Sequence, residues 1–221
     1  MLPMRHGYSN DTRSDGAVVL KRYQGPDRAT RRQREYAALQ RLRGRLPVPP
    51  LWGGDEVSVC LGFISGVHGQ DLIEAGQAPA VLRACGQMLN RIHEVDPAQV
   101  FPGTTLHSGQ VLVHGDYGPN NLLLDPDTFA VTAVLDWEWA EPGNPVRDLA
   151  WCEWIVRMHH REHIDALDEF FDAYGHRPAW PLRHQAMLVQ CRSLLEMCRH
   201  WTTEAASLWQ RRLDMTAAWT E

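Results

Sequence analysis

The chain has 221 residues, 44% of them hydrophobic, so it can bury a core, and its length falls between one domain and two. Its formal net charge is -5 at pH 7 and its arginines are scattered among acidic residues, which excludes the basic stripe of a nucleic-acid-binding protein. No eighteen apolar residues run together and the N-terminus lacks the apolar core of a signal peptide, so we expect a soluble protein without a membrane partner.

A strand and a helix are predicted near the start of the chain. Residues 17–23 are rich in β-branched side chains and lie between two turn-forming pairs, so we expect a strand that carries Lys21 near its far end. Residues 29–43 place apolar side chains at helical spacing until a run of prolines stops the pattern, which predicts a helix that contains Glu35. A lysine on a strand therefore precedes a glutamate on a helix.

A second strand is predicted at 57–64, and the glycines that follow it are typical of a flexible connection. We place a boundary near Ser65 and expect two lobes, 1–65 and 66–221. The second lobe is the more helical one, so the sequence predicts an α+β fold.

The second lobe is predicted to hold a helix, a group of short strands and then only helices. Apolar residues between 81 and 92 share one helical face, which we expect to pack inward. Short apolar runs predict strands at 111–113, 122–124 and 131–135, the last two joined by turn residues. After Pro145 the pattern is helical, and helices are expected at 149–158, 164–174 and 182–219.

The five cysteines indicate the redox compartment. The chain has no CxxC pair, and most of the cysteines lie among apolar neighbours, which is typical of reduced, buried thiols. We therefore expect a cytoplasmic location.

Polar residues frame the short apolar hairpin in the middle of the chain. Asp116 and Asn121 are separated by a segment that Pro119 stiffens, so both side chains can face one point. Asp136 follows the hairpin, which brings a second carboxylate back beside the first, and a divalent cation would relieve their repulsion. Because oxygen ligands together with substrate phosphates suit Mg²⁺ better than zinc, the sequence predicts a magnesium site.

A cation of the protein is also needed to bind the triphosphate of a nucleotide. Lys21 can supply that cation from its strand, and Glu35 on the following helix can hold it in position through an ion pair. Phosphoryl transfer of the kinase type uses this arrangement of lysine, glutamate and metal-binding carboxylate.

Several segments in order along the chain resemble the aminoglycoside phosphotransferase family of small-molecule kinases. The segments are His114-Gly115-Asp116 with Asn121, Leu135-Asp136-Trp137-Glu138, and Gly143-Asn144-Pro145-Val146-Arg147-Asp148-Leu149-Ala150. The N-terminal lobe of that family is resembled by Gly7-Tyr8-Ser9-Asn10-Asp11-Thr12, Lys21 and Glu35. The match runs from Gly7 to Ala150, and the later helices resemble the family only in being helical.

The resemblance implies a bilobal protein-kinase-like fold, with a small antiparallel-sheet N-lobe and a larger, mainly helical C-lobe. It further implies transfer of a γ-phosphoryl group from ATP or GTP to a hydroxyl of a small molecule, with Mg²⁺ as cofactor. The chain lacks a glycine-rich GxGxxG segment. The loop that would cover the nucleotide is therefore expected to be short, and weak nucleotide affinity is one consequence.

The family's roles carry over to matching positions of this chain. Asp116 is expected to accept or orient the hydroxyl of the substrate, while Asn121 and Asp136 hold Mg²⁺. Lys21 is expected to contact the α- and β-phosphates, and Glu35 to fix Lys21. The remaining nucleotide contacts are expected at Ser9, Asn10, Gly62, Phe63 and Ile64, the last three through backbone groups beside the base.

Two residues of the motifs are expected to support the loop, and two tryptophans have an open role. His114 is predicted to brace the loop backbone, and Asp148 to cap a helix or to hold the loop in place. Trp137 and Trp139 flank the metal-binding aspartate, so they could line a substrate pocket.

Other functions and several acceptors remain open. The first alternative is a nucleotide-binding regulatory module with weak or no activity, which the trimmed N-terminal lobe favours. A metallophosphoesterase ranks last because the chain has no upstream Asp-x-His to complete a two-metal site.

The acceptor is expected to be an aminoglycoside, a choline-like amino-alcohol or a sugar. Aromatic rings suit a quaternary amine, and acidic residues favour a cation. The acidic residues are Glu141, Glu153, Asp165, Asp168, Glu169, Asp172 and Glu196. Arginines on the same helices add positive charge, so the electrostatic field has both signs and the acceptor stays open. The choice between ATP and GTP and the oligomeric state also stay open.

Overall fold

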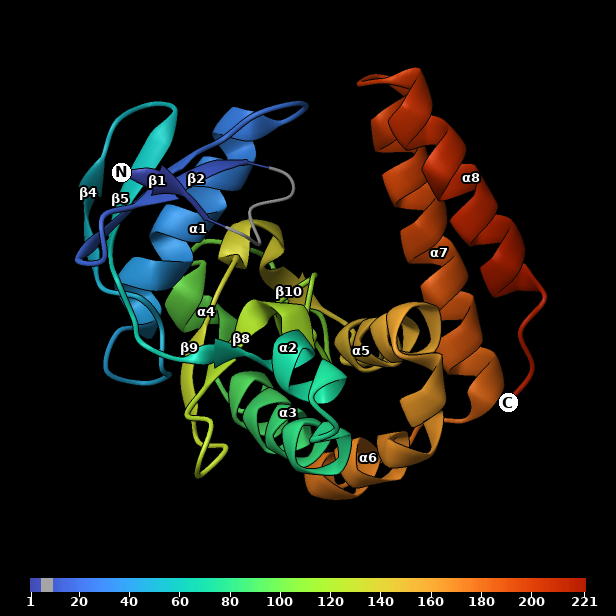
Figure 1. Cartoon of the computed structure of the whole chain (residues 1–221). Helices are drawn as coiled ribbons and strands as arrows, with labels where there is room; N and C mark the ends of the chain where they lie inside the picture. Colours follow the sequence, from blue (N-terminus) through green and yellow to red (C-terminus); the bar gives the residue numbers. More distant parts are fainter. Residues whose placement is uncertain (5–9) are drawn as a thin grey trace.

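The computed structural model describes residues 1–4 and 10–221, which form a small sheet-bearing part and a larger, mainly helical part (Figure 1). The α+β architecture expected from the sequence is confirmed, with an antiparallel sheet first and helices after it. The division into lobes at residue 65 stays a prediction. Across the residues that the structure describes, every helix is too short or too polar to span a lipid bilayer.

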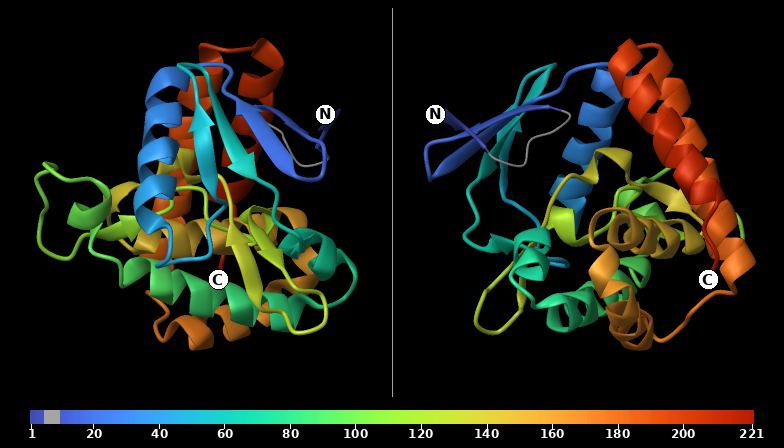
Figure 2. Two further views of the ribbon diagram at one scale, coloured as in Figure 1. Left: turned by 90° about the vertical axis from the view of Figure 1, so that its left-hand side faces the viewer. Right: turned by 45° about the vertical axis from the view of Figure 1, so that its right-hand side comes forward.

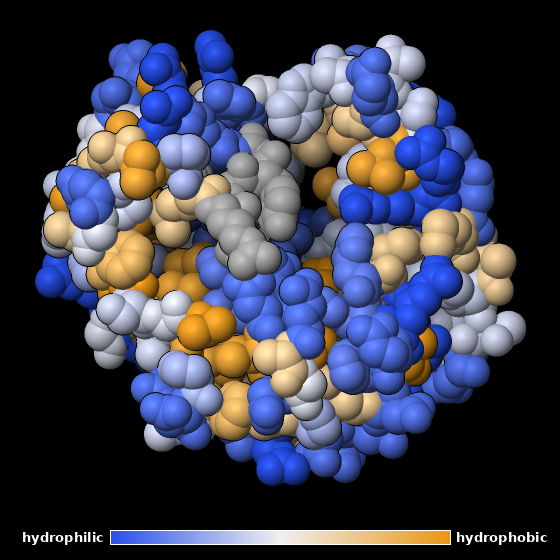
Figure 3. Space-filling view, in the orientation of Figure 1, coloured by the Kyte–Doolittle hydropathy of each residue, from blue (hydrophilic) through white to orange (hydrophobic). Residues whose placement is uncertain are grey.

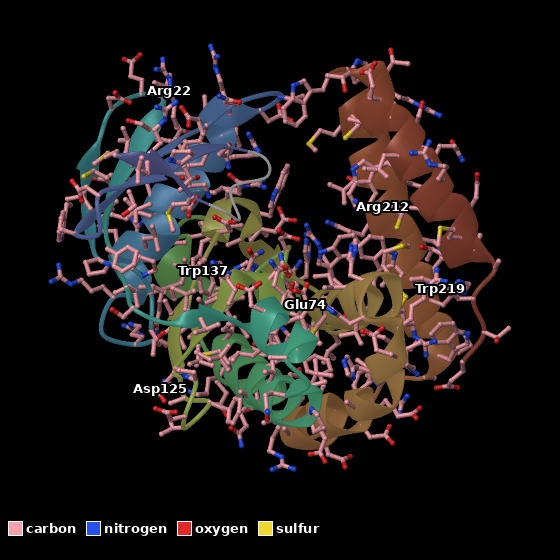
Figure 4. The ribbon with its side chains drawn as sticks, viewed as in Figure 1. Arg22, Glu74, Asp125, Trp137, Arg212 and Trp219 are labelled. Atoms are coloured by element: carbon pink, nitrogen blue, oxygen red, sulfur yellow. The ribbon has the colours of Figure 1, made fainter. Side chains whose placement is uncertain are left out.

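An antiparallel sheet and one helix build the N-terminal part. Its strands pair in the order β1-β2-β3-β5-β4 within the described residues. Side chains alternate along β3 and beyond it, so Lys21 and Tyr23 are buried while Leu20 and Arg22 are exposed (Figure 4). The elements are β1 (Leu2–Pro3), β2 (Asp11–Ser14), β3 (Val18–Arg22), α1 (Arg28–Leu42), β4 (Leu51–Gly54) and β5 (Ser58–Gly62).

Short strands form the middle of the molecule. The predicted hairpin is present, with Leu122 opposite Val134, and β6 pairs with its first strand. A second pair, β7 with β10, was only half predicted, because the Pro-Gly sequence of β10 has no strand pattern. The strands are β6 (Val67–His68), β7 (Val111–Val113), β8 (Leu122–Leu124), β9 (Val131–Val134) and β10 (Glu141–Gly143).

Helices make up most of the C-terminal part, and Figure 2 shows α7 and α8 as an antiparallel pair along one side of the molecule. The pair α3 and α6 packs at the opposite end from the sheet (Figure 1). The α-helices are α2 (Gly69–Glu74), α3 (Ala78–His93), α4 (Pro97–Val100), α5 (Val146–His159), α6 (Leu167–Tyr174), α7 (Trp180–Arg199) and α8 (Thr203–Ala217). Short 3-10 turns occur at η1 (Pro119–Asn121), η2 (Trp137–Trp139) and η3 (Arg161–Ala166).

The long helical stretch expected at 182–219 is divided into two helices, because the chain reverses between α7 and α8. Thr202 is the residue before α8, and its hydroxyl accepts a hydrogen bond from the backbone N–H of Ala205 at 3.1 Å. A threonine in extended conformation that caps the next turn starts a new helix. Apolar periodicity does not by itself show where a helical stretch reverses.

A continuous apolar core joins the sheet-bearing part to the helices. The face of α3 predicted to pack inward is buried, including Leu82, Leu89 and Ile92. Trp137 is also completely buried and its indole N–H donates to the backbone oxygen of Val134 at 3.0 Å. The suggestion that Trp137 lines a substrate pocket is therefore wrong, because its ring belongs to the core.

A second apolar cluster joins α5, α7 and α8. It contains Trp151, Trp154, Met187 and Cys191, and Trp209 packs against it. The five cysteines are free, in agreement with reduced thiols, whereas the cytoplasmic location stays a prediction.

A hollow separates the sheet-bearing part from the α7–α8 pair (Figure 3). The turn between α7 and α8 reaches the other side at one point, where a Cβ atom added to Gly25 would lie 3.1 Å from the ring of Trp201. Trp201 remains 41% exposed, so this contact bridges the two parts without burying the ring.

Candidate functional site

The loop after β7 carries the predicted catalytic aspartate on a tight turn. Gly115 has a φ of 85°, and a Cβ atom at this position would lie 2.5 Å from the backbone oxygen of Trp139. Only glycine combines this left-handed conformation with such a close approach of two backbones. The turn directs Asp116 away from the core and toward the hairpin.

Asp148 at the start of α5 fixes this loop. Its carboxylate accepts hydrogen bonds from the backbone N–H groups of His114 at 2.7 Å and Gly115 at 2.8 Å. Burial by itself raises the pKa of Asp148. The hydrogen bonds from His93 and from the loop lower the pKa by a larger amount, so the net shift is downward. Of the two supporting roles predicted for Asp148, holding the loop is the one that the contacts show.

His114 braces the loop from the other side. Its Nε2 lies 2.8 Å from the backbone oxygen of Leu135, and its Nδ1 accepts from the backbone N–H of Asp116 at 3.3 Å. Complete burial lowers the pKa of His114, so the ring is neutral and carries its proton on Nε2. The predicted bracing role of His114 agrees with these contacts.

The carboxylate of Asp116 is held by two donors. The indole N–H of Trp151 donates to one oxygen at 2.8 Å, and the amide of Asn121 donates to the other at 3.0 Å. Burial raises the pKa of Asp116 to about 7, and the nearby carboxylate of Asp136 raises it as well, while the two donors lower it. The side chain is partly accessible, so a reactant can reach it.

The hairpin returns Asp136 to this loop. The backbone N–H of Leu135 donates to the backbone oxygen of Asn121 at 2.8 Å, which places the residue after β9 beside the residue before β8. Asp136 has left-handed backbone angles of φ 60° and ψ 56°. Such angles are costly for a residue other than glycine and cluster at functional sites, although aspartate tolerates them better than most.

Lys21 links the sheet to the hairpin. Its ammonium group lies 2.6 Å from Glu35 on α1, 2.7 Å from Asp136 and 3.5 Å from Glu138. Burial lowers the pKa of Lys21, but the three carboxylates raise it well above its ordinary value, so the amine stays charged. Tyr23 adds a hydrogen bond to Glu35 at 2.5 Å. The structure therefore brings together the lysine, the glutamate and the aspartate that the sequence selected.

Three further buried residues extend this network, and sequence reasoning gave two of them no role. Glu138 lies 3.3 Å from the guanidinium of Arg31 and accepts from the amide of Asn10 at 3.0 Å. Asn10 was expected to contact nucleotide, but here its side chain is bound to protein groups. Arg31 has no motif that marks it, whereas Glu138 stands in the segment after Asp136. Ser9 lies outside the described residues.

The predicted base-docking segment follows β5. The backbone N–H of Gly62 donates to Pro50 at 2.8 Å, and that of Phe63 donates to Ala17 at 2.9 Å. These two donors are therefore used by the sheet, whereas Ile64 lies beyond the strand and is half-buried. The side chain of Phe63 is exposed just past the end of β5.

The donor atoms of the site fit a magnesium ion. Asn121 donates through its amide nitrogen to Asp116, so its amide oxygen points the other way. Asp136 uses one oxygen for Lys21 and its side chain is 40% exposed, which leaves the second oxygen accessible. Two oxygen ligands from protein, with the rest from phosphate and water, are the usual environment of Mg²⁺ in nucleotide sites.

The sequence matches one family over most of its length. The family described as "Phosphotransferase enzyme family", abbreviated APH, matches residues 2–109 and 102–186. Among curated proteins, acyl-CoA dehydrogenase family member 11 from Mus musculus is 32% identical over 83 residues. That match spans 32% of this chain and 11% of the relative, so this chain covers only about a tenth of that protein's length.

Solved structures share the fold at low sequence identity. The GDP complex of wild-type aminoglycoside 2'-phosphotransferase-IIIa has a TM-score of 0.75 and 14% identity, covering 98% of this chain and 92% of that one. A thermostable mutant of aminoglycoside phosphotransferase APH(4)-Ia, in a ternary complex with ADP and hygromycin B, has a TM-score of 0.65 and 18% identity. The match with this second structure covers 99% of the present chain and 94% of the solved one. The expected protein-kinase-like fold is thereby confirmed.

Proposed function

The chain belongs to the phosphotransferase enzyme family, and we propose on this premise that it transfers the γ-phosphoryl group of a nucleoside triphosphate to a hydroxyl group of a small molecule. The observation that carries the proposal is the position of Lys21, whose amine joins Glu35 and Asp136 at 2.6 and 2.7 Å. These contacts connect the sheet, α1 and the hairpin at the place where a triphosphate needs a cation.

Asp116 acts on the acceptor. Its carboxylate, oriented by Trp151 and Asn121, accepts the hydrogen bond of the acceptor hydroxyl and takes its proton. The hydroxyl oxygen forms a bond to the γ-phosphorus as the bond between that phosphorus and the bridging oxygen breaks. The nucleoside diphosphate leaves with the electron pair of the broken bond, so atoms and charges balance.

The remaining residues position the donor. Asn121 and Asp136 hold Mg²⁺, which neutralises charge on the phosphates when it is bound. Lys21 contacts the α- and β-phosphates and Glu35 keeps it in place. The segment 1–65 acts as the nucleotide-binding lobe, with Asn10, Ser9 and the backbone at 62–64 near the nucleotide, and 66–221 carries the acceptor site.

The identity of the donor is left between ATP and GTP. One similar solved structure is described with GDP and another with ADP, so the fold is compatible with either base. The alternative of a regulatory module without activity shares the whole nucleotide site and differs only in the absence of phosphorylated product.

The test is a transfer assay with Mg-ATP or Mg-GTP and a panel of hydroxylated compounds. We expect one or more compounds to be phosphorylated, and Asp116→Asn to lower kcat by about a thousandfold, because the amide cannot take the proton. The matched control is Asp125→Asn, a partly exposed aspartate at the tip of the hairpin (Figure 4). Undiminished turnover by the Asp116 variant would refute the assignment, and nucleotide binding without product would favour the regulatory alternative.

A further inference from the structure

The acidic residues that favoured a cationic acceptor either form ion pairs with arginines or lie away from the hollow. Five of the seven are in ion pairs with arginines, which neutralise their charge. These are Glu141, Glu153, Asp168, Glu169 and Glu196. The other two, Asp165 and Asp172, lie in η3 and α6, on the side of the molecule away from the hollow (Figure 1). The attraction for a cation that the sequence suggested is therefore absent from these seven residues.

Arg212 on α8 is instead a candidate group for binding an anion. Within the described part of the chain no carboxylate pairs with its guanidinium, and the titratable groups near it include the thiols of Cys191 and Cys198 and the imidazole of His159. The residue is half-buried, and Figure 4 places its label on the side of the α7–α8 pair that faces the hollow. Burial lowers its pKa, yet arginine remains charged at any physiological pH.

Aromatic rings connect Arg212 to the catalytic loop. The guanidinium lies 4.7 Å from the ring centre of Trp209 and 5.8 Å from that of Trp154. Trp209 in turn lies 6.2 Å from Trp151, and Trp151 donates its indole N–H to Asp116. Within the described residues no hydrogen bond engages the guanidinium, and the side chain is only half-buried, so part of it is accessible to solvent. A planar donor group supported by aromatic faces is suited to a carboxylate or phosphate.

We propose that the acceptor of this enzyme carries an oxyanion, a carboxylate or a phosphate ester, which Arg212 binds beside Trp209 while the acceptor hydroxyl reaches Asp116. The proposal rests on the proposed function and names its substrate class. A bidentate ion pair at a half-buried arginine is stronger than at an exposed one, because less solvent screens it. Uncharged and cationic compounds lack this contact, and a cation is repelled by the unpaired guanidinium.

Paired acceptors test the substrate class. Each pair shares its hydroxyl groups and differs in the oxyanion: glucose 6-phosphate against glucose for the phosphate ester, and glycerate against glycerol for the carboxylate. Kanamycin serves as the cationic acceptor. We expect kcat/KM to be at least about tenfold higher for an anionic member than for its neutral partner, from one ion pair to a half-buried arginine. A preference for kanamycin or for the neutral members would overturn the proposal.

Variants of two neighbouring arginines test the residue. Arg212→Gln should raise KM for the charged acceptors by about ten- to a hundredfold and leave the neutral partners unchanged, because only the anion loses its contact. Arg212→Lys keeps the charge without the planar fork and should fall between. Arg211→Gln, which removes an exposed charge one residue away, should behave as the unchanged protein. Equal effects of the two glutamine variants would contradict a specific site.

A binding measurement separates this proposal from the proposed function. Saturation-transfer NMR with glucose 6-phosphate and with glycerate is carried out on the unchanged protein, on Asp116→Asn and on Arg212→Gln. Binding to the first two proteins but not to the third supports the oxyanion site even if no transfer is detected, in which case only the proposed function fails. If neither glucose 6-phosphate nor glycerate binds to the unchanged protein, the inference is overturned. Binding that persists in Arg212→Gln overturns it as well.

Discussion

At the scale of single residues, the site concentrates buried charge. Lys21 and Arg31 face the carboxylates of Glu35, Asp136 and Glu138, so negative groups outnumber positive ones by three to two. Charges removed from water are stable only when they are paired, and one unbalanced negative charge favours a bound cation. The excess is the physical reason why a magnesium ion suits the place where Asp136 is accessible.

The pH dependence of transfer should follow Asp116. Burial raises its pKa to about 7, and a general base works only as the carboxylate, so activity should rise with pH through 7. We expect kcat/KM at pH 6 to be roughly a tenth of the value at pH 8, since about one base in eleven is then ionised. Steady-state assays from pH 5.5 to 8.5 measure this.

The same shift has a consequence for stability. The pKa of Asp116 in the folded state lies above that in the unfolded chain, so the contribution of this one group to stability is fully present below its unfolded pKa and is lost as pH rises through about 7. Asp116→Asn removes this cost and should melt no lower than the unchanged protein at pH 8. A flat activity profile between pH 6 and 8 would show that Asp116 does not titrate in the reaction.

At the scale of elements, the loop that carries Asp116 is fixed by α5 rather than by its own sequence. Asp148 binds two consecutive backbone N–H groups of the loop, and β10 pairs with β7 beside it. The loop residues 114–116 are thereby attached to a helix that begins more than thirty residues later in the chain. The position of Asp116 depends on this long-range attachment.

Removal of the attachment should affect both stability and activity. Asp148→Ala leaves the N–H groups of His114 and Gly115 buried without acceptors, at a cost of about 1–3 kcal/mol each. We expect the free energy of unfolding to fall by about 2–5 kcal/mol in urea titrations, and kcat to fall at least about tenfold through misplacement of the base.

The control for that variant is Asp172→Ala, which removes an exposed carboxylate from α6. It should change the free energy of unfolding by less than about 0.5 kcal/mol. Equal midpoints for the two variants would mean that Asp148 does not hold the loop.

At the scale of the whole molecule, the site is assembled from parts far apart in the sequence. The sheet provides Lys21, α1 provides Glu35, and the hairpin provides Asp136, while the α7–α8 pair stands across the hollow (Figure 3). A ligand that contacts several of these parts stabilises the folded state as a whole.

Nucleotide should therefore stabilise the protein, and it should do so through magnesium. At a nucleotide concentration of about one hundred times Kd the gain is about 2.7 kcal/mol, or a rise in Tm of roughly 5–11 °C for a chain of this size. Asp136→Asn should abolish the dependence on Mg²⁺, because one of two proposed protein ligands is lost. Thermal melts with nucleotide in Mg²⁺ and in EDTA measure this, and equal rises in both would refute a role for the metal.

Local patterns predicted the elements and the main polar residues because both depend on near neighbours. The helix with Glu35, the strand with Lys21 and the hairpin before Asp136 follow from apolar spacing and turn residues. Glu138 was noted but given no role, and Arg31 was missed, because its place in the network is created by a contact with a residue 107 positions away. A buried arginine on a helix has no local signature.

The sequence by itself determined the fold class, the family and the order of the site residues, because these are written in periodicity and in short motifs. Only the tertiary structure decided which charges are neutralised. It showed that Glu153 is paired with Arg157 and Arg183 while Arg212 has no carboxylate partner in the described residues. Composition gives only the number of charged residues. The electrostatic field around a ligand depends on which charges pair with each other and which face solvent, and packing decides both.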